Sequence, residues 1–144
     1  MKKKLLYLIL PIVTLILEIL PYGAVCNFMR PPSGVNPDAP VGHFRELYSY
    51  FDLTPFGYAN FAPLLTAILT CAILVMLLIY LFTGKQGIAS ATKVMVGLGV
   101  LLSLCPLLFG ISFFSVVGVL ITVTLLAEFI LMQFTMKKVP TETT

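Results

Sequence analysis

Long apolar stretches alternate with short polar segments along this chain of 144 residues. Four of these stretches carry at most one charged residue each, and they cover residues 5–26, 58–82, 94–110 and 113–136. Each is close to the ~20 residues that an α-helix needs to cross the hydrocarbon core of a bilayer. The pattern predicts an all-α polytopic membrane protein, with four transmembrane helices in one bundle and a single membrane domain over residues 1–144.

Residues 27–57 form the longest polar segment and are predicted to lie outside the membrane. Prolines and glycine break any helix in the first half of this segment. From Pro40 to Asp52, apolar side chains recur at positions i, i+3, i+4 and i+7, the spacing of one helix face. These side chains are Phe44, Leu47, Tyr48 and Phe51. We therefore expect a short amphipathic helix that lies at the membrane interface.

Composition and charge agree with a membrane protein. Hydrophobic residues make up 59% of the chain and charged residues 10%, against about 25% charged residues in soluble domains. The net charge of +3 arises from lysines that flank the apolar stretches. Placing both termini in the cytoplasm puts every lysine inside and leaves Arg30 and Arg45 outside, which is the usual orientation bias. The positive charge thus indicates lipid headgroups rather than nucleic acid, and we expect a bacterial cytoplasmic membrane.

The first apolar stretch has a second interpretation, as a secretory signal peptide. Lys2–Lys4 precede it, and the small residues Gly23 and Ala24 lie near a possible cleavage site. The stretch is long for a signal peptide, however, and it contains Pro11 and Glu18. These features favour a span that stays in the mature chain.

Glu18 and Glu128 are the only charged residues inside the predicted spans. A carboxylate in hydrocarbon is costly unless it is paired, wetted or protonated, and such residues often mark ion pathways. Thr14 and Thr124 each precede one glutamate by four residues, about one helical turn. Counting ~1.5 Å per residue from the inner edge places Glu18 and Thr124 about 20 and 17 Å deep, and Glu128 and Thr14 about 10 and 13 Å. We expect the first and fourth helices to be antiparallel neighbours, with each glutamate beside the other helix's threonine.

The remaining reactive side chains form no catalytic or metal-binding pattern. Cys26, Cys71 and Cys105 are not at metal-ligand spacing, although a bridge between Cys26 and Cys105 is geometrically conceivable. His43 has no partners at ligand spacing. The sequence predicts no cofactor and no metal, and it favours a protein without catalytic activity.

Three functions remain open from the sequence. The favoured one is a small structural or accessory subunit that binds another membrane protein or self-associates. The alternative is a small oligomeric transporter or channel component that uses Glu18 and Glu128, and a membrane enzyme or enzyme subunit is favoured least. The long first outer loop and short second loop resemble the layout of claudin-like tetraspan proteins. The chain has no Trp and no pair of cysteines in the loop, so this resemblance is one of layout alone.

Overall fold

The computed structural model describes residues 2–30, 42–53, 55 and 60–135. For residues 2–6 and 30 it describes the backbone but not the side chains. The described residues form four α-helices, two strands and two short 3-10 helices. In chain order they are α1 (Lys2–Ile19), β1 (Ala24–Arg30), β2 (Gly42–Tyr48), α2 (Ala62–Thr83), α3 (Gln86–Leu104), η1 (Cys105–Phe109), η2 (Ile111–Phe113) and α4 (Val116–Thr135).

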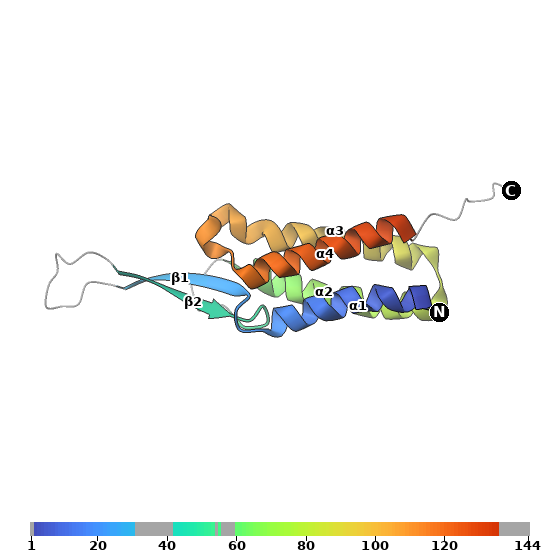
Figure 1. Cartoon of the computed structure of the whole chain (residues 1–144), viewed down its shortest axis with the longest axis horizontal. Coiled ribbons are helices and arrows are strands. Elements are labelled where there is room, and N and C mark those ends of the chain that lie inside the picture. The colour runs from blue at the N-terminus through green and yellow to red at the C-terminus, as the bar shows by residue number, and fades with distance from the viewer. Residues whose placement is uncertain (1, 31–41, 54, 56–59, 136–144) are drawn as a thin grey trace, which may run out of the picture.

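The four helices lie side by side, and the β1–β2 hairpin projects from one end of the bundle (Figure 1). The start of α1, the end of α4 and the α2–α3 turn lie at the opposite end (Figure 1). Helix α1 contacts α2 and α4, and α3 contacts the same two helices. The helices therefore form a closed ring in the order α1, α2, α3, α4.

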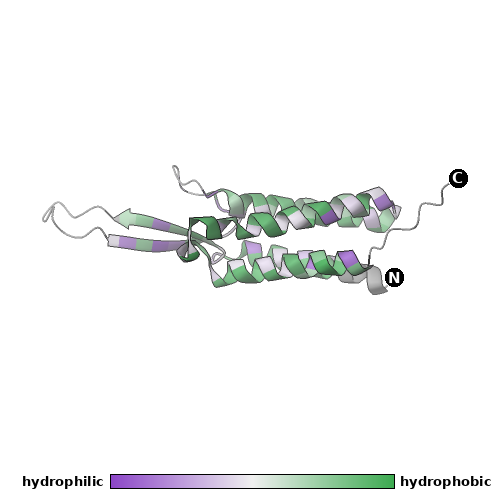
Figure 2. Cartoon of the chain, turned by 90° about the horizontal axis from the view of Figure 1, so that it is seen from above, coloured by the Kyte–Doolittle hydropathy of each residue, from purple (hydrophilic) through white to green (hydrophobic). Residues whose placement is uncertain are grey.

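Three helical segments are long and apolar enough to cross a membrane, namely Ala62–Thr83, Gln86–Phe109 and Val116–Thr135. In α1, the apolar portion Tyr7–Ile19 is shorter. Apolar residues cover most of the helical surface, whereas polar residues are more frequent on the hairpin (Figure 2). The mostly helical fold and the long apolar helices thus agree with the sequence-based expectation.

The helix boundaries differ most from the predicted spans at two places. Helix α1 ends at Ile19 rather than near Cys26, because the chain turns at Pro21 and Ala24 already belongs to β1. Helix α3 begins at Gln86, ahead of the predicted start at residue 94. Hydropathy finds only the apolar part of a helix, whereas backbone hydrogen bonding continues into polar residues at its end.

A single glycine makes the turn between α2 and α3. Gly84 has φ 64° and donates its backbone N–H to the Tyr80 carbonyl oxygen at 2.8 Å. This left-handed conformation favours glycine and is a common way to end a helix. The turn is so tight that α2 and α3 must run antiparallel as neighbours.

The predicted interfacial helix is wrong. Phe44, Leu47 and Tyr48 lie in strand β2, and Phe51 lies in the turn that follows it. Strand β2 pairs antiparallel with β1, in a register that runs from Ala24 opposite Tyr48 to Arg30 opposite Gly42. A local pattern of eight residues cannot reveal this partner strand, which supplies the backbone hydrogen bonds that a helix would make internally. The fold is therefore not all-α, because it includes a two-stranded sheet.

The core of the described residues consists of two apolar clusters. The cluster near the start of α1 contains Tyr7, Ile73, Leu77, Ala89, Val96 and Met132. The cluster near the hairpin contains Ala24, Tyr50, Ala67, Ile121 and Leu125. Polar side chains are buried in the bundle together with these clusters, and they are the first candidates for function.

Candidate functional site

Two glutamates are buried inside the bundle. Glu18 on α1 and Glu128 on α4 have exposed fractions of 0% and 1%. Thr70 on α2 donates its hydroxyl to Glu18 Oε1 at 2.7 Å. Within the described residues, Glu18 Oε2 and both carboxylate oxygens of Glu128 have no hydrogen-bond partner. Burying a polar group without a hydrogen-bond partner costs free energy. The burial of Glu128 is therefore more costly than the burial of Glu18.

The threonines expected beside the glutamates contact each other instead. Thr14 on α1 donates its hydroxyl to Thr124 on α4 at 2.8 Å. Helices α1 and α4 are thus adjacent, as the sequence predicts, but Glu18 is bonded to Thr70 and not to Thr124. The expected bond between Glu128 and Thr14 is also not formed.

The error in the pairing has a simple cause. The count of ~1.5 Å per residue assumes that both apolar stretches begin at the same depth, and it places Thr14 about 4 Å below Thr124. If α1 is shifted along the bundle axis by less than one helical turn relative to α4, the two threonines lie at the same depth. Thr70 has no feature in the sequence that distinguishes it from Thr66, which lies one turn away on the same helix face.

The two glutamates are well separated along the bundle. Each lies four residues from the Thr14–Thr124 contact, in opposite directions along the bundle axis. At ~1.5 Å per residue, this spacing separates the two Cα positions by roughly 12 Å along the axis. The arrangement provides two separate carboxyl positions rather than one shared pair.

Buried hydrogen bonds attach the hairpin to the bundle. The Glu18 carbonyl oxygen accepts the Tyr50 backbone N–H at 2.9 Å and the Ser49 hydroxyl at 3.0 Å. On the other side, the Ser115 hydroxyl donates to the Gly23 carbonyl oxygen at 2.5 Å. Tyr50 is 1% exposed, and burial raises the pKa of its phenol above the usual range. The base of the hairpin is therefore held by α1 and by the start of α4.

Beyond its base, the hairpin is largely exposed. Every residue of β2 before Tyr48 is exposed, and within the described residues β2 pairs only with β1. The Phe28 and Phe44 rings stack across the two strands at a centroid distance of 5.2 Å. On the same face, Tyr48 donates a hydrogen bond to Glu46, which raises the pKa of Tyr48 to about 12. Side chains of the hairpin thus contact one another on this face. One edge of β2 pairs with no strand in the described structure.

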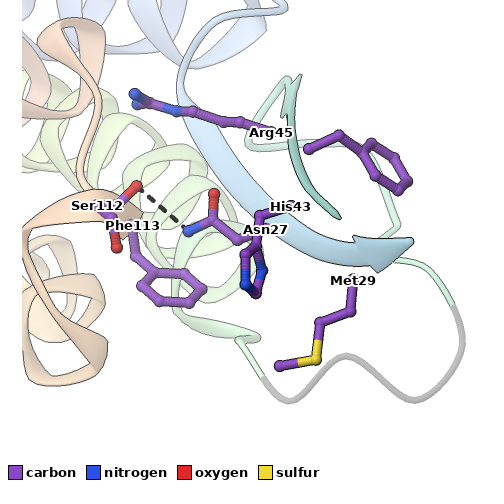
Figure 3. Close-up of a pocket in the computed structure, with 7 residues that line it drawn as sticks. Asn27, Met29, His43, Arg45, Ser112 and Phe113 are labelled. Carbon is purple, nitrogen blue, oxygen red and sulfur yellow. Dashed lines mark hydrogen bonds between the residues drawn. The ribbon is translucent and has the colours of Figure 1, made fainter. Parts of the chain in front are cut away.

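A pocket of about 460 Å³ lies between the hairpin and η2, and Phe44 also contributes to its lining (Figure 3). Asn27, His43 and Phe113 lie together, between Arg45 and Met29 in this view (Figure 3). Asn27 donates its side-chain N–H to the Ser112 carbonyl oxygen at 3.4 Å. The pocket combines a cation and polar groups with apolar walls.

The described residues contain no cluster of side chains that could bind a metal ion. No group of three His, Cys, Asp or Glu side chains lies close enough there to hold a metal ion. No disulfide bond joins any two of Cys26, Cys71 and Cys105, so the conceivable bridge between Cys26 and Cys105 is not formed.

The chain was compared with known proteins at three levels. No family model matches it, and neither a curated protein nor a solved structure gives a match.

Proposed function

We propose that this chain is an integral membrane protein with four spans and cytoplasmic termini, and that it serves as an accessory subunit. In this role the hairpin outside the membrane binds another membrane protein. The observation that carries the proposal is the long, exposed β2 strand with an edge that no described residue pairs.

The surface of the bundle supports membrane insertion. Large apolar side chains point away from the bundle on α1 and α4, for example Ile16 at 56% exposed, Val123 at 54% and Phe134 at 74%. Water-soluble monomers rarely expose continuous apolar surface of this kind. Helix α1 has 18 residues, or about 27 Å at ~1.5 Å per residue. This length includes the charged segment Lys2–Lys4, and the apolar part Tyr7–Ile19 is about 20 Å long. A bilayer can thin around a span that is shorter than its hydrocarbon core of ~30 Å, so we propose α1 as the fourth span.

The hairpin supports a docking role because two strands alone make a weak sheet. An isolated two-stranded hairpin is at best marginally stable in water, and an open edge readily pairs with another strand. Met29 is 73% exposed, Leu47 41% and Phe44 38%. A partner strand beside β2 would satisfy its backbone groups and cover apolar side chains, which is strand addition to a sheet edge.

A different protein fits this edge better than a second copy of the chain. Arg45 is the middle residue of β2. A twofold-symmetric pairing of two β2 edges about their midpoints would place Arg45 opposite its own copy. Like charges directly opposite each other destabilise an antiparallel pair.

Site-specific photo-cross-linking tests the docking role. A photoreactive residue at Leu47 on β2 should give one protein adduct in intact cells, and mass spectrometry should identify it as another membrane protein. The matched control is Val123, a similarly exposed residue on α4, which should react with lipid instead. Adducts only to the chain itself, or equal protein adducts at both positions, would contradict the proposal.

Glu128 favours a second candidate, a small oligomeric transporter or channel component. A buried carboxyl group without a described partner is the kind of group that binds protons or cations inside membranes. Proton flux through vesicles of the purified chain, abolished by Glu128→Gln, would place this candidate ahead of docking.

A further inference from the structure

The pocket at the base of the hairpin has the size and chemistry of a ligand site. Its volume of about 460 Å³ falls within the roughly 300–1,000 Å³ of typical small-molecule pockets. Asn27 and Ser112 line it with amide and hydroxyl groups, His43 adds an imidazole, and Met29 and Phe113 supply apolar walls.

The charge in this pocket is positive. Among the described residues that line it, Arg45 is the only side chain of fixed charge. Within the part of the chain that the structure describes, its one hydrogen bond is a 3.4 Å contact from Nη2 to the Phe114 carbonyl oxygen. The guanidinium has five N–H donors, so most of them remain for a ligand.

Neighbouring carboxylates are directed elsewhere. Glu46 is not among the described residues that line the pocket, and it accepts a hydrogen bond from Tyr48. Asp52 Oδ2 accepts the backbone N–H of Ser49 at 2.7 Å. An anion in the pocket would therefore meet Arg45 without a carboxylate among the lining residues.

An apolar surface adjoins the pocket. Leu108 on η1 and Ile111 on η2 are 85% and 86% exposed, and η2 itself forms one wall of the pocket through Phe113. The segment of η1 and η2 connects α3 to α4 at the end of the bundle where the hairpin begins (Figure 1). In the proposed membrane orientation this is the level at which headgroups meet acyl chains.

We propose that this pocket binds an anionic phospholipid of the outer leaflet. Arg45 and His43 donate hydrogen bonds to the phosphate oxygens, and Asn27 contributes its amide. The acyl chains run along Leu108 and Ile111. The inference rests on the proposed membrane insertion, but it does not depend on the docking role of the β2 edge.

Native mass spectrometry of the full-length chain in detergent tests the proposal, with phosphatidylglycerol as the probe. One lipid should bind tightly, and Arg45→Gln should weaken this binding roughly tenfold or more, because a hydrogen bond to a charged group contributes about 1.5–3 kcal/mol. Lys85→Gln removes an exposed cation at the opposite end of the bundle and should leave the binding unchanged. Thermal unfolding of both variants should match the wild type, and Arg45→Lys should restore part of the affinity.

Two further measurements distinguish a lipid from a free anion. Ile111→Ser should weaken phosphatidylglycerol binding, and inorganic phosphate at millimolar concentration should displace little of the lipid. If phosphate displaces the lipid fully and Ile111→Ser has no effect, the pocket is a free-anion site and the phospholipid assignment is wrong. If Arg45→Gln leaves tight lipid binding unchanged, the inference fails while membrane insertion stands. If the wild type binds no phospholipid at all, membrane insertion is in question as well.

Discussion

At the scale of single residues, the described bundle interior leaves more carboxylate oxygens unpartnered than it satisfies. Glu18 has one bond, from Thr70 on a neighbouring helix, and the described residues supply none to Glu128. The Thr14–Thr124 bond satisfies hydroxyl groups between these two levels. In the proposed membrane setting, hydrogen bonds between helices contribute little to stability, on average ~0.6 kcal/mol. Their main effect here is to set which faces of α1, α2 and α4 meet.

Thr70→Val removes the only hydrogen bond that a described residue makes to the Glu18 carboxyl group, and it leaves both carboxyl oxygens without a described partner. We expect it to lower the free energy of unfolding by about 1–2 kcal/mol, since a buried unsatisfied polar group costs about that much. Thr66→Val is the matched control, because Thr66 is equally buried but donates its hydroxyl only to Ala62 on its own helix. Its cost should be about half or less. Equal losses in the two variants, measured by equilibrium unfolding in bicelles, would show that the Glu18 contact contributes nothing.

At the scale of elements, the hairpin depends on how closely it joins the bundle. Gly23 lies between the end of α1 and the start of β1, against the buried ring of Tyr50. A Cβ atom added at Gly23 would lie 2.8 Å from Tyr50 Cδ1 and 2.9 Å from Cε1. Tyr50 cannot move freely, because its backbone N–H is bonded to the Glu18 carbonyl oxygen.

Gly23→Ala should therefore lower the free energy of unfolding by about 1–3 kcal/mol, the usual cost of overpacking a core. Hydrogen exchange should also be faster in β1 and β2, because the steric conflict lies at the base of the hairpin. Gly87→Ala is the control, since nothing lies within 4 Å of a Cβ at Gly87. In this helical position it should be neutral or stabilising by up to ~1 kcal/mol. Unchanged exchange in the hairpin of Gly23→Ala would show that the junction tolerates the methyl group.

At the scale of the whole molecule, the ring of four helices has two distinct ends. One carries the hairpin, η1 and η2, and the other carries the start of α1 and the α2–α3 turn (Figure 1). Lys85 lies in that turn, and the flanking lysines of the sequence favour the cytoplasm for this end.

Single cysteines at Leu53 and Lys85 should report this orientation, in a background without the native cysteines. Leu53 is 81% exposed just beyond the hairpin, and Lys85 is exposed at the opposite end. In intact cells a membrane-impermeant maleimide should label position 53 and not position 85, and permeabilisation should expose both. Labelling of both positions in intact cells would contradict the four-span orientation.

The sequence alone determined which segments become the long helices, because a run of ~20 apolar residues has few other solutions than a membrane-spanning or deeply buried helix. It also indicated that α1 and α4 are neighbours. In addition, it identified Glu18 and Glu128 as the only charged residues inside the predicted spans. It did not reveal the hairpin, because the pairing of Ala24–Arg30 with Gly42–Tyr48 joins two segments that are separated by residues 31–41, and a local pattern covers only one of them. The local spacing of Phe44, Leu47 and Tyr48 fits a helix. Only the pairing with β1 shows that this segment is a strand.

Tertiary structure also decided the polar contacts. A shift of less than one turn between α1 and α4 changed every predicted pair, so that Thr14 meets Thr124 and Glu18 meets Thr70. Such axial shifts depend on how side chains of different size pack between helices. They cannot be predicted from the composition of the helices. The pocket beside Arg45 likewise exists only because η2 folds against the hairpin. Local hydropathy determines where the chain is helical, whereas the packing of distant segments determines which of its few polar groups meet.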